Sequence, residues 1–211
     1  MGKREENKAR AEFEKALEKE LRECIKKTGW RKFQSTIFKV ESLYFFSSTF
    51  FICLDNRINL SLRVKPFEID NIFWDIMDME INKNEPLSLR YNGSFICSNI
   101  PILEHNLIYS DYSPQTMALK IFEWTLVNME AFIKKYQNLP FSDIIKNNSA
   151  FPSKGSYSEA VVCSLIYEGR NEEAKQLADD ILLNKKPKTG DYITKSISFF
   201  EHAKIWIEKN A

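Results

Sequence analysis

Apolar residues in the first third of the chain recur first at helical spacing and then at strand spacing. A charged helix is predicted from Glu5 to Lys27, because its apolar residues lie three or four positions apart and form one narrow stripe: Phe13, Leu17, Leu21, and Cys24 or Ile25. β-Branched and aromatic residues then dominate positions 30 to 66, where three strands of an antiparallel meander are predicted. The third strand alternates strictly between apolar and polar residues, so one face of it should carry Ile58, Leu60, Leu62 and Val64. The second strand is dense in aromatic residues, so we expect it to be central and covered on both faces.

After Pro66 the period changes twice. Positions 68 to 80 carry apolar residues at helical spacing and predict a short helix whose inward side consists of Ile69, Ile72, Phe73, Ile76 and Met77. Asn92-Gly93 then separates two β-like arms, which predicts a hairpin with a type I′ turn, because both central residues of that turn need a positive φ. An irregular or extended connection is expected from Pro101 onward.

The C-terminal half is predicted to be helical. Ser113 and Pro114 supply an N-cap and a first-turn proline for a long helix that extends to about Gln137. A last helix is predicted from Tyr192 to Lys209, where apolar residues again recur at helical spacing.

Between these helices, positions 157 to 183 predict a pair of short helices. Gly169 would end the first helix and Asn171 would cap the second. The pair resembles one tetratricopeptide unit, but such units occur in arrays and the chain holds no second copy. We therefore interpret it as a packed helix hairpin that closes a domain, and not as a recognition repeat.

The order of these elements predicts an α+β fold. It comprises an N-terminal helix, an antiparallel β-meander of about five strands with an inserted short helix, and a C-terminal bundle of about four helices. The length of 211 residues suits a single domain, 1–211, in which the helix and sheet of 1–110 carry the helical part 111–211.

Composition narrows the classes of partner. The formal net charge of +1 gives no global field toward nucleic acid or a membrane surface, and the Lys and Arg residues of the N-terminal helix are interleaved with Glu. The apolar run from 43 to 54 is too short to cross a bilayer. We therefore predict no nucleic acid partner, no membrane partner and a cytoplasmic location.

Residue types that carry chemistry are sparse and scattered. The four cysteines lack the short spacing of zinc ligands, so we expect reduced thiols packed in the core: Cys24, Cys53, Cys97 and Cys163. His105 and His202 are isolated, and Glu104 would point to the side of an extended segment opposite His105. The sequence contains no nucleophile elbow, phosphate-binding loop or calcium loop. We predict no catalytic residue, no metal site and no cofactor.

Negative charge is concentrated in one segment, 67–85, which contains six carboxylates and a single basic residue, Lys83. If residues 68 to 80 are helical, Trp74 lies among carboxylates on the face opposite the apolar stripe, which would suit an interface anchor. The alternative places Trp74 beneath the C-terminal helices or the N-terminal helix. The candidate partner-binding residues are Asp70, Asn71, Trp74, Asp75, Asp78 and Glu80.

The chain also resembles a group of bacterial α+β proteins. The similarity is carried by the charged leading helix, by "GWRKFQSTIFKV" with the aromatic meander, and by "YEGRNEEAKQLA" in the terminal helices. Members of this group occur as immunity proteins that neutralise toxins delivered between competing bacteria. The resemblance implies a protein that binds a cognate toxin and blocks its active site, and an acidic face would suit a basic nuclease toxin. It transfers no functional residue to this sequence.

Two other functions stay open at this point. A regulatory or adaptor domain would share the lack of catalytic motifs. An enzyme that works through a pair of carboxylates would also escape detection, because such a pair cannot be identified in a single sequence.

Overall fold

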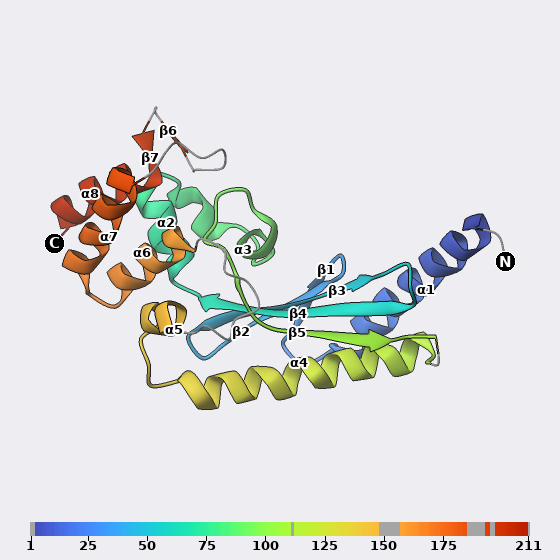
Figure 1. The fold of residues 1–211 in the computed structure, drawn as a ribbon. Coiled ribbons are helices and arrows are strands. Elements are labelled where there is room, and N and C mark those ends of the chain that lie inside the picture. The colour runs from blue at the N-terminus through green and yellow to red at the C-terminus, as the bar shows by residue number, and fades with distance from the viewer. Residues whose placement is uncertain (1–2, 111, 148–156, 185–192, 195–196, 211) are drawn as a thin grey trace. The chain divides into compact units, whose positions relative to one another are not determined.

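The computed structural model describes residues 3–110, 112–147, 157–184, 193–194 and 197–210 (Figure 1). It confirms the α+β class: an N-terminal helix, a five-stranded antiparallel meander and several C-terminal helices. The chain groups into two compact units. The sheet unit contains residues 1–41, 45–64 and 101–137, and the helical unit contains residues 42–44, 65–100 and 138–211. The predicted division at residue 110 does not follow this grouping, because the long helix after residue 110 belongs with the sheet.

In the sheet unit, the meander follows chain order. Its strands are β1 (Arg31–Phe33), β2 (Thr36–Glu41), β3 (Tyr44–Ile52), β4 (Arg57–Pro66) and β5 (Ile100–Ile108), and their spatial order is β1-β2-β3-β4-β5. The central position predicted for the aromatic second strand is therefore confirmed for β3. The alternation predicted in β4 is confirmed too: one side is buried through Ile58, Leu60, Leu62 and Val64.

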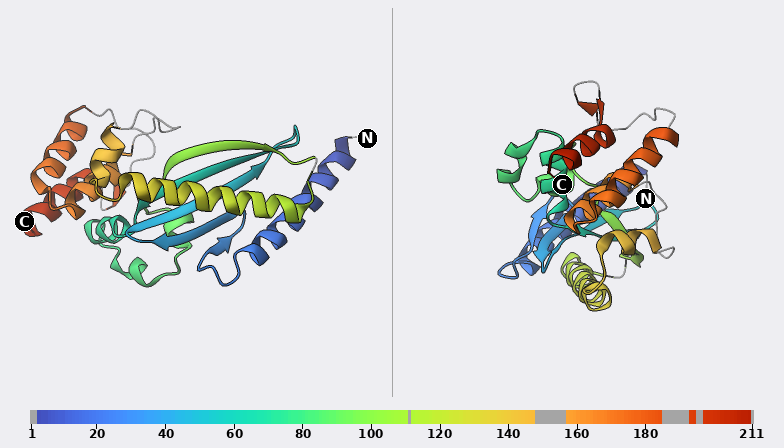
Figure 2. Two further views of the ribbon diagram at one scale, coloured as in Figure 1. Left: turned by 90° about the horizontal axis from the view of Figure 1, so that it is seen from below. Right: turned by 90° about the vertical axis from the view of Figure 1, so that its left-hand side faces the viewer.

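Two helices of the sheet unit cover one face of the sheet (Figure 2). They are α1 (Lys3–Cys24) and α4 (Pro114–Tyr136), which pack against each other. The Ser48 hydroxyl of β3 lies 2.8 Å from that of Thr125 in a buried hydrogen bond, and the Phe46 ring meets Phe132 edge-on at 5.8 Å. The predicted cap is confirmed, because the Ser113 side chain accepts a hydrogen bond from the Thr116 backbone N–H at 3.1 Å.

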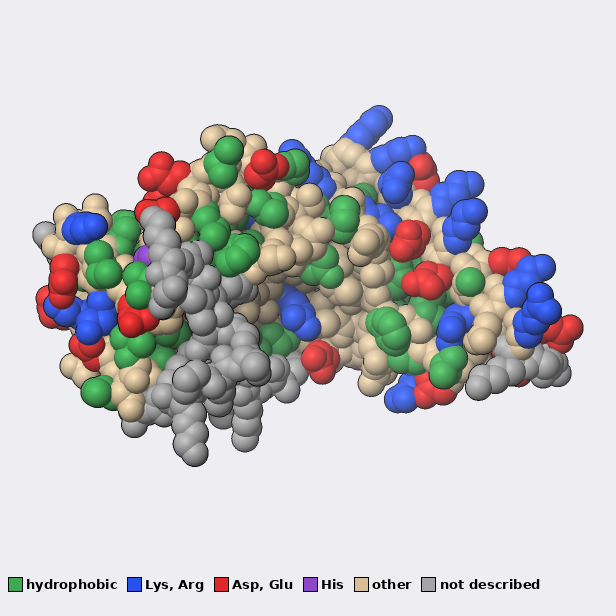
Figure 3. All heavy atoms as spheres, turned by 90° about the horizontal axis from the view of Figure 1, so that it is seen from above, with side chains coloured by type: hydrophobic (Ala, Val, Ile, Leu, Met, Phe, Trp, Pro, Cys, Tyr) green, Lys and Arg blue, Asp and Glu red, His purple; other side chains and the backbone are tan. Residues whose placement is uncertain are grey.

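The exposed surface of the N-terminal helix has mixed charge, as predicted. In the space-filling view, Lys and Arg side chains gather toward the N-terminal end of the sheet unit, with Asp and Glu side chains among them (Figure 3). Lys8 pairs with Glu12 across one helical turn at 3.9 Å, although both side chains are largely exposed.

The five strands arise differently from the prediction. A two-residue turn at Gln34 and Ser35 splits the first predicted strand into β1 and β2, with Phe33 opposite Thr36. Gln34 takes a positive φ of 49° there, a value that its side chain does not signal. The fifth strand is β5, in the segment expected to be an irregular or extended connection.

The predicted hairpin at Asn92-Gly93 is wrong. Residues Leu89–Asn92 form a helical turn, α3, and Gly93 has φ −67° and ψ 154°, which is ordinary extended backbone. The glycine serves close approach: a Cβ at position 93 would lie 2.6 Å from the carbonyl oxygen of Leu89. Asn-Gly thus marks a contact too tight for a side chain, and not a type I′ turn.

In the part of the chain that the structure describes, the helical unit contains the other helices and one small sheet. They are α2 (Ile69–Ile76), the 3₁₀ helix η1 (Glu80–Asn84), α3, α5 (Phe141–Asn147), α6 (Ser158–Tyr167), α7 (Asn171–Asn184) and α8 (Phe199–Asn210), with β6 (Ile193–Thr194) antiparallel to β7 (Ile197–Ser198). α2 packs against α6 and α8 over a buried apolar cluster. The start predicted for the last helix, at Tyr192, lies outside the described residues.

The helix hairpin predicted at 157–183 is confirmed as α6 and α7, which pack together. Gly169 ends α6 with φ +74°; its N–H donates to the Ile166 carbonyl at 3.0 Å, and the Arg170 N–H donates to the Leu165 carbonyl at 2.8 Å. These two bonds make a Schellman motif. The cap predicted at Asn171 is wrong, because the Arg170 carbonyl accepts the first bond of α7, from Ala174.

Replacing Gly169 by Ala should lower the free energy of unfolding by about 1 kcal/mol, because a Cβ disfavours the left-handed backbone. Apart from the two adjoining residues, no atom of the described residues lies within 4 Å of that Cβ position, so the penalty expected is one of backbone conformation. Gly169→Asn is the matched control and should lose less, since Asn tolerates this conformation better. If urea denaturation gave Gly169→Ala and the wild type the same free energy of unfolding, the left-handed conformation assigned to Gly169 would be contradicted.

Candidate protein-binding surface

The helical unit divides the six predicted partner-binding residues between its interior and its surface. Asp70 and Trp74 have no exposed surface, Asn71 and Asp75 are half-buried, and Asp78 and Glu80 are exposed. The placement of Trp74 on an outer face is therefore wrong, and the candidate partner-binding residue Asp70 is buried as well. The alternative for Trp74, burial beneath the C-terminal helices, is correct, because it belongs to the cluster formed with α6 and α8.

Asp70 is held by a buried ion pair. The ammonium of Lys65 lies 2.8 Å from each carboxylate oxygen of Asp70, and both side chains have no exposed surface. The backbone of Cys97 completes the arrangement: its N–H donates to Asp70 Oδ1 at 2.9 Å, and its carbonyl accepts from Lys65 at 2.8 Å. Two opposite charges thus share one site, and backbone groups from a distant part of the sequence satisfy their further hydrogen bonds.

Arg90 joins this pair to the aromatic side of the cluster. One of its nitrogens donates to the Phe67 carbonyl at 2.9 Å and lies 3.5 Å from Asp70 Oδ2, and another donates to Asn71 at 2.6 Å. Its guanidinium carbon lies 4.7 Å from the centroid of the Trp74 ring and 3.9 Å from that of Phe67. Burial lowers the pKa of Arg90, although the charge of Asp70 opposes the shift.

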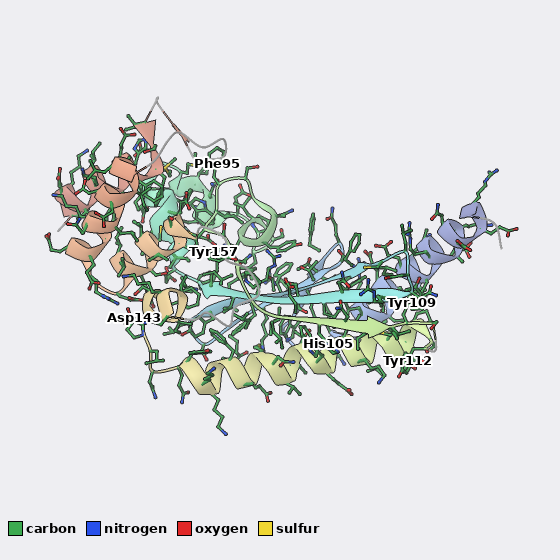
Figure 4. The ribbon with its side chains drawn as sticks, in the orientation of Figure 1. Phe95, His105, Tyr109, Tyr112, Asp143 and Tyr157 are labelled. Atoms are coloured by element: carbon green, nitrogen blue, oxygen red, sulfur yellow. The ribbon has the colours of Figure 1, made fainter. Side chains whose placement is uncertain are left out.

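Trp74 has the surroundings of a core residue. Its indole N–H donates to the Phe95 carbonyl at 2.7 Å, so its polar group is satisfied inside the protein (Figure 4 marks Phe95). The sequence did carry a signal for this. α2 has apolar residues on more than one side, and such a helix is buried on more than one side. Its buried residues are Ile69, Asp70, Phe73, Trp74 and Ile76.

The surface that remains acidic is the loop that follows α2, residues 78–85, which we call the acidic loop. Asp78 takes a positive φ of 57°, and the Met79 N–H donates to the Trp74 carbonyl at 2.7 Å, so the loop turns directly off the buried helix. Glu80, Glu85 and Asp78 are exposed, and Lys83 pairs with Asp75 of α2. The acidic loop therefore presents three carboxylates on and beside a short 3₁₀ helix attached to the core.

Sequence reasoning missed Ile81 at the centre of this loop. Its side chain is 75% exposed. Polar residues flank it in the sequence, and it belongs to no periodic apolar stripe, so no pattern drew attention to it. A single exposed isoleucine needs no explanation by itself. Here it occupies the place that the sequence assigned to Trp74, as the apolar residue among carboxylates.

A second polar cluster connects α5 to the α6–α7 turn. Arg170 donates to Asp143 at 2.8 Å and to the Ser142 hydroxyl at 2.9 Å, and it forms two further bonds with Glu173. The Ser142 hydroxyl donates to Glu168 at 2.5 Å. Bonding to Arg170 lowers the pKa of Glu173, the opposite of what a general acid requires. We assign this cluster a structural role, the attachment of α5.

The cysteines fall into two groups. Cys97 and Cys163 are buried, as predicted, whereas Cys24 and Cys53 are only partly buried, and all four are free thiols. Burial raises the pKa of the Cys97 thiol well above its usual range, and the neighbouring Cys163 adds to the shift. Within the described ranges, no group of three or more His, Cys, Asp and Glu side chains has the geometry of a metal site.

Comparison of the chain with protein-family models, with curated proteins and with solved structures gave no match. The resemblance to bacterial immunity proteins therefore stays a prediction from the sequence. Among the helices that the structure describes, none combines the length and the apolar character needed to cross a membrane.

Trp74→Ala should lower the free energy of unfolding by about 3–5 kcal/mol, the usual cost of deleting a buried large aromatic side chain. Ile81→Ala, in the acidic loop and exposed, should change it by less than about 0.5 kcal/mol. Chemical denaturation of both variants measures the difference. Unchanged stability of the Trp74→Ala variant would contradict the burial of Trp74 and indicate an exposed side chain.

Asp70→Asn should cost about 3–5 kcal/mol, because it leaves the buried Lys65 ammonium without a counter-charge. Asp78→Asn is the matched control: it removes an exposed carboxylate, and Asn tolerates the positive φ at that position. Similar melting temperatures for the two variants would show that the Lys65–Asp70 pair carries little of the fold.

Proposed function

We propose that this protein is an immunity protein that binds a basic toxin by protein–protein contact through its acidic loop. The observation that carries the proposal is the exposed Ile81 surrounded in the loop by Asp78, Glu80 and Glu85. An apolar residue at the centre and charged residues around it is the common arrangement of protein interfaces.

The attachment of the loop favours binding. The Met79 N–H is bonded to the carbonyl of the buried Trp74, and Asp75 of α2 pairs with Lys83 of the loop. A loop held this way loses little conformational entropy when a partner binds, so more of the contact energy appears as affinity.

Charge supports a basic partner. The acidic loop carries three carboxylates and one lysine, although the whole chain has a formal net charge of +1. Nucleases have basic surfaces because they bind a phosphate backbone, so a nuclease toxin would be attracted to this loop. An inhibitor that occupies such a surface competes with nucleic acid for it.

Co-expression tests this function directly. The protein encoded by the neighbouring gene is produced in a bacterial host with and without this chain, and colony formation is measured. Protection of the host supports the proposal. A neighbouring product unrelated to any secreted toxin, together with no protection, would sink it; binding of a housekeeping protein at the acidic loop would favour the adaptor alternative.

Ile81→Ala should weaken binding of the purified toxin by roughly 30-fold, the effect expected when a central apolar anchor is truncated. Leu183→Ala is the control, because Leu183 is 83% exposed in the same unit but lies outside the acidic loop. Calorimetric titration measures both. Equal affinity of the two variants would remove Ile81 from the interface.

Glu80→Lys should slow association and reduce its dependence on salt, because rim charges act mainly through long-range attraction. Stopped-flow association at several salt concentrations gives the comparison. An unchanged salt dependence would mean that the toxin approaches another surface.

A further inference from the structure

The outer edge of β5 carries the features of a self-pairing strand. β5 is the last strand of the meander, so within the described residues no strand pairs with its outer side. It has nine residues, and residues 103 to 106 are exposed. Proteins usually shorten, cover or charge such edges, because unpaired N–H and C=O groups invite another strand.

The hydrogen-bonding direction along β5 follows from its C-terminal end. The Tyr109 N–H donates to the Asn56 carbonyl at 3.0 Å, at the turn that precedes β4. Because backbone groups alternate in direction along an antiparallel strand, those of 103, 105 and 107 also face β4. Those of Ile102, Glu104, Asn106 and Ile108 face outward.

Side-chain placement agrees with this assignment. Residues directly opposite in an antiparallel pair share a face, so 103, 105 and 107 should lie on the helix-covered side with the buried residues of β4. His105 does lie there: its ring stacks on Trp124 of α4 with centroids 6.0 Å apart (Figure 4).

The sequence of this edge is self-complementary. Read outward from His105, the classes of residue are the same in both directions: Glu104 and Asn106 are polar, Leu103 and Leu107 are leucines, and Ile102 and Ile108 are isoleucines. A two-fold interface requires that a surface match itself, and this strand meets that requirement when the axis passes through His105.

We propose that β5 pairs with β5 of a second copy of this chain, in antiparallel register centred on His105. The outward groups of Glu104 then exchange hydrogen bonds with those of Asn106 of the second copy, and Ile102 does the same with Ile108. On the helix-covered side, Leu103 contacts Leu107 of the second copy.

The proposed pairing of Glu104 with Asn106 of the second copy can be tested in the full-length chain by measuring dimer formation. Light scattering after size-exclusion chromatography should give a mass of twice 24.8 kDa at micromolar concentration. Asn106→Glu should convert the protein to a monomer, because it places two carboxylates opposite each other on both sides of the axis. Adding Glu104→Lys should restore the dimer, since the lysine introduced at position 104 then faces the glutamate introduced at position 106 of the second copy.

Arg31→Glu, on the edge strand at the other side of the sheet, is the control and should leave the dimer intact. Circular dichroism of each variant verifies that it is folded. A monomeric wild-type chain would overturn the proposal, as would a dimer that survives Asn106→Glu or a double variant that fails to recover. Pairing of β5 with an extended segment of a different protein, in a chain that is otherwise a monomer, would also overturn the proposal.

Discussion

The helical unit depends on one buried ion pair, Lys65 with Asp70. Two unpaired charges in this position would each cost several kcal/mol, so the fold is compatible only with arrangements that keep them together. The pair also fixes Cys97, because both backbone groups of that residue bond to it. The chain is therefore fastened at three sequence positions, and α2 carries the middle one, Asp70.

The position of α2 determines which residues of this segment are exposed to a binding partner. With Asp70 turned toward Lys65, Trp74 one turn later faces the same interior and stacks near Arg90. Neither residue is then available to a partner. The recognition surface that the sequence placed on α2 moves to the acidic loop, whose Ile81 and carboxylates follow the end of that helix.

The class of the fold and the order of its elements could be predicted because periodicity records which faces are buried. Alternation in β4, the cap at Ser113 and the helix stop at Gly169 each have a local physical cause, and each was predicted correctly. The turn at Asn92-Gly93 was not, because a glycine required for close approach looks the same in sequence as one required for a turn.

The candidate site was harder to predict for a related reason. Whether Asp70 faces water or a lysine depends on a partner that only the folded chain brings near, so a count of carboxylates overstated the acidic face. Ile81 was missed because an isolated apolar residue in a polar segment has no periodic signal. Burial of Trp74 could have been inferred from the apolar residues on several sides of α2.

Hydrogen–deuterium exchange of the full chain, with and without the inactivated product of the neighbouring gene, shows which residues a toxin covers. If the toxin binds the acidic loop, binding slows exchange in residues 78–85 while the amides of α2, already buried, change little. Slowed exchange elsewhere with no change in the acidic loop would contradict that binding site.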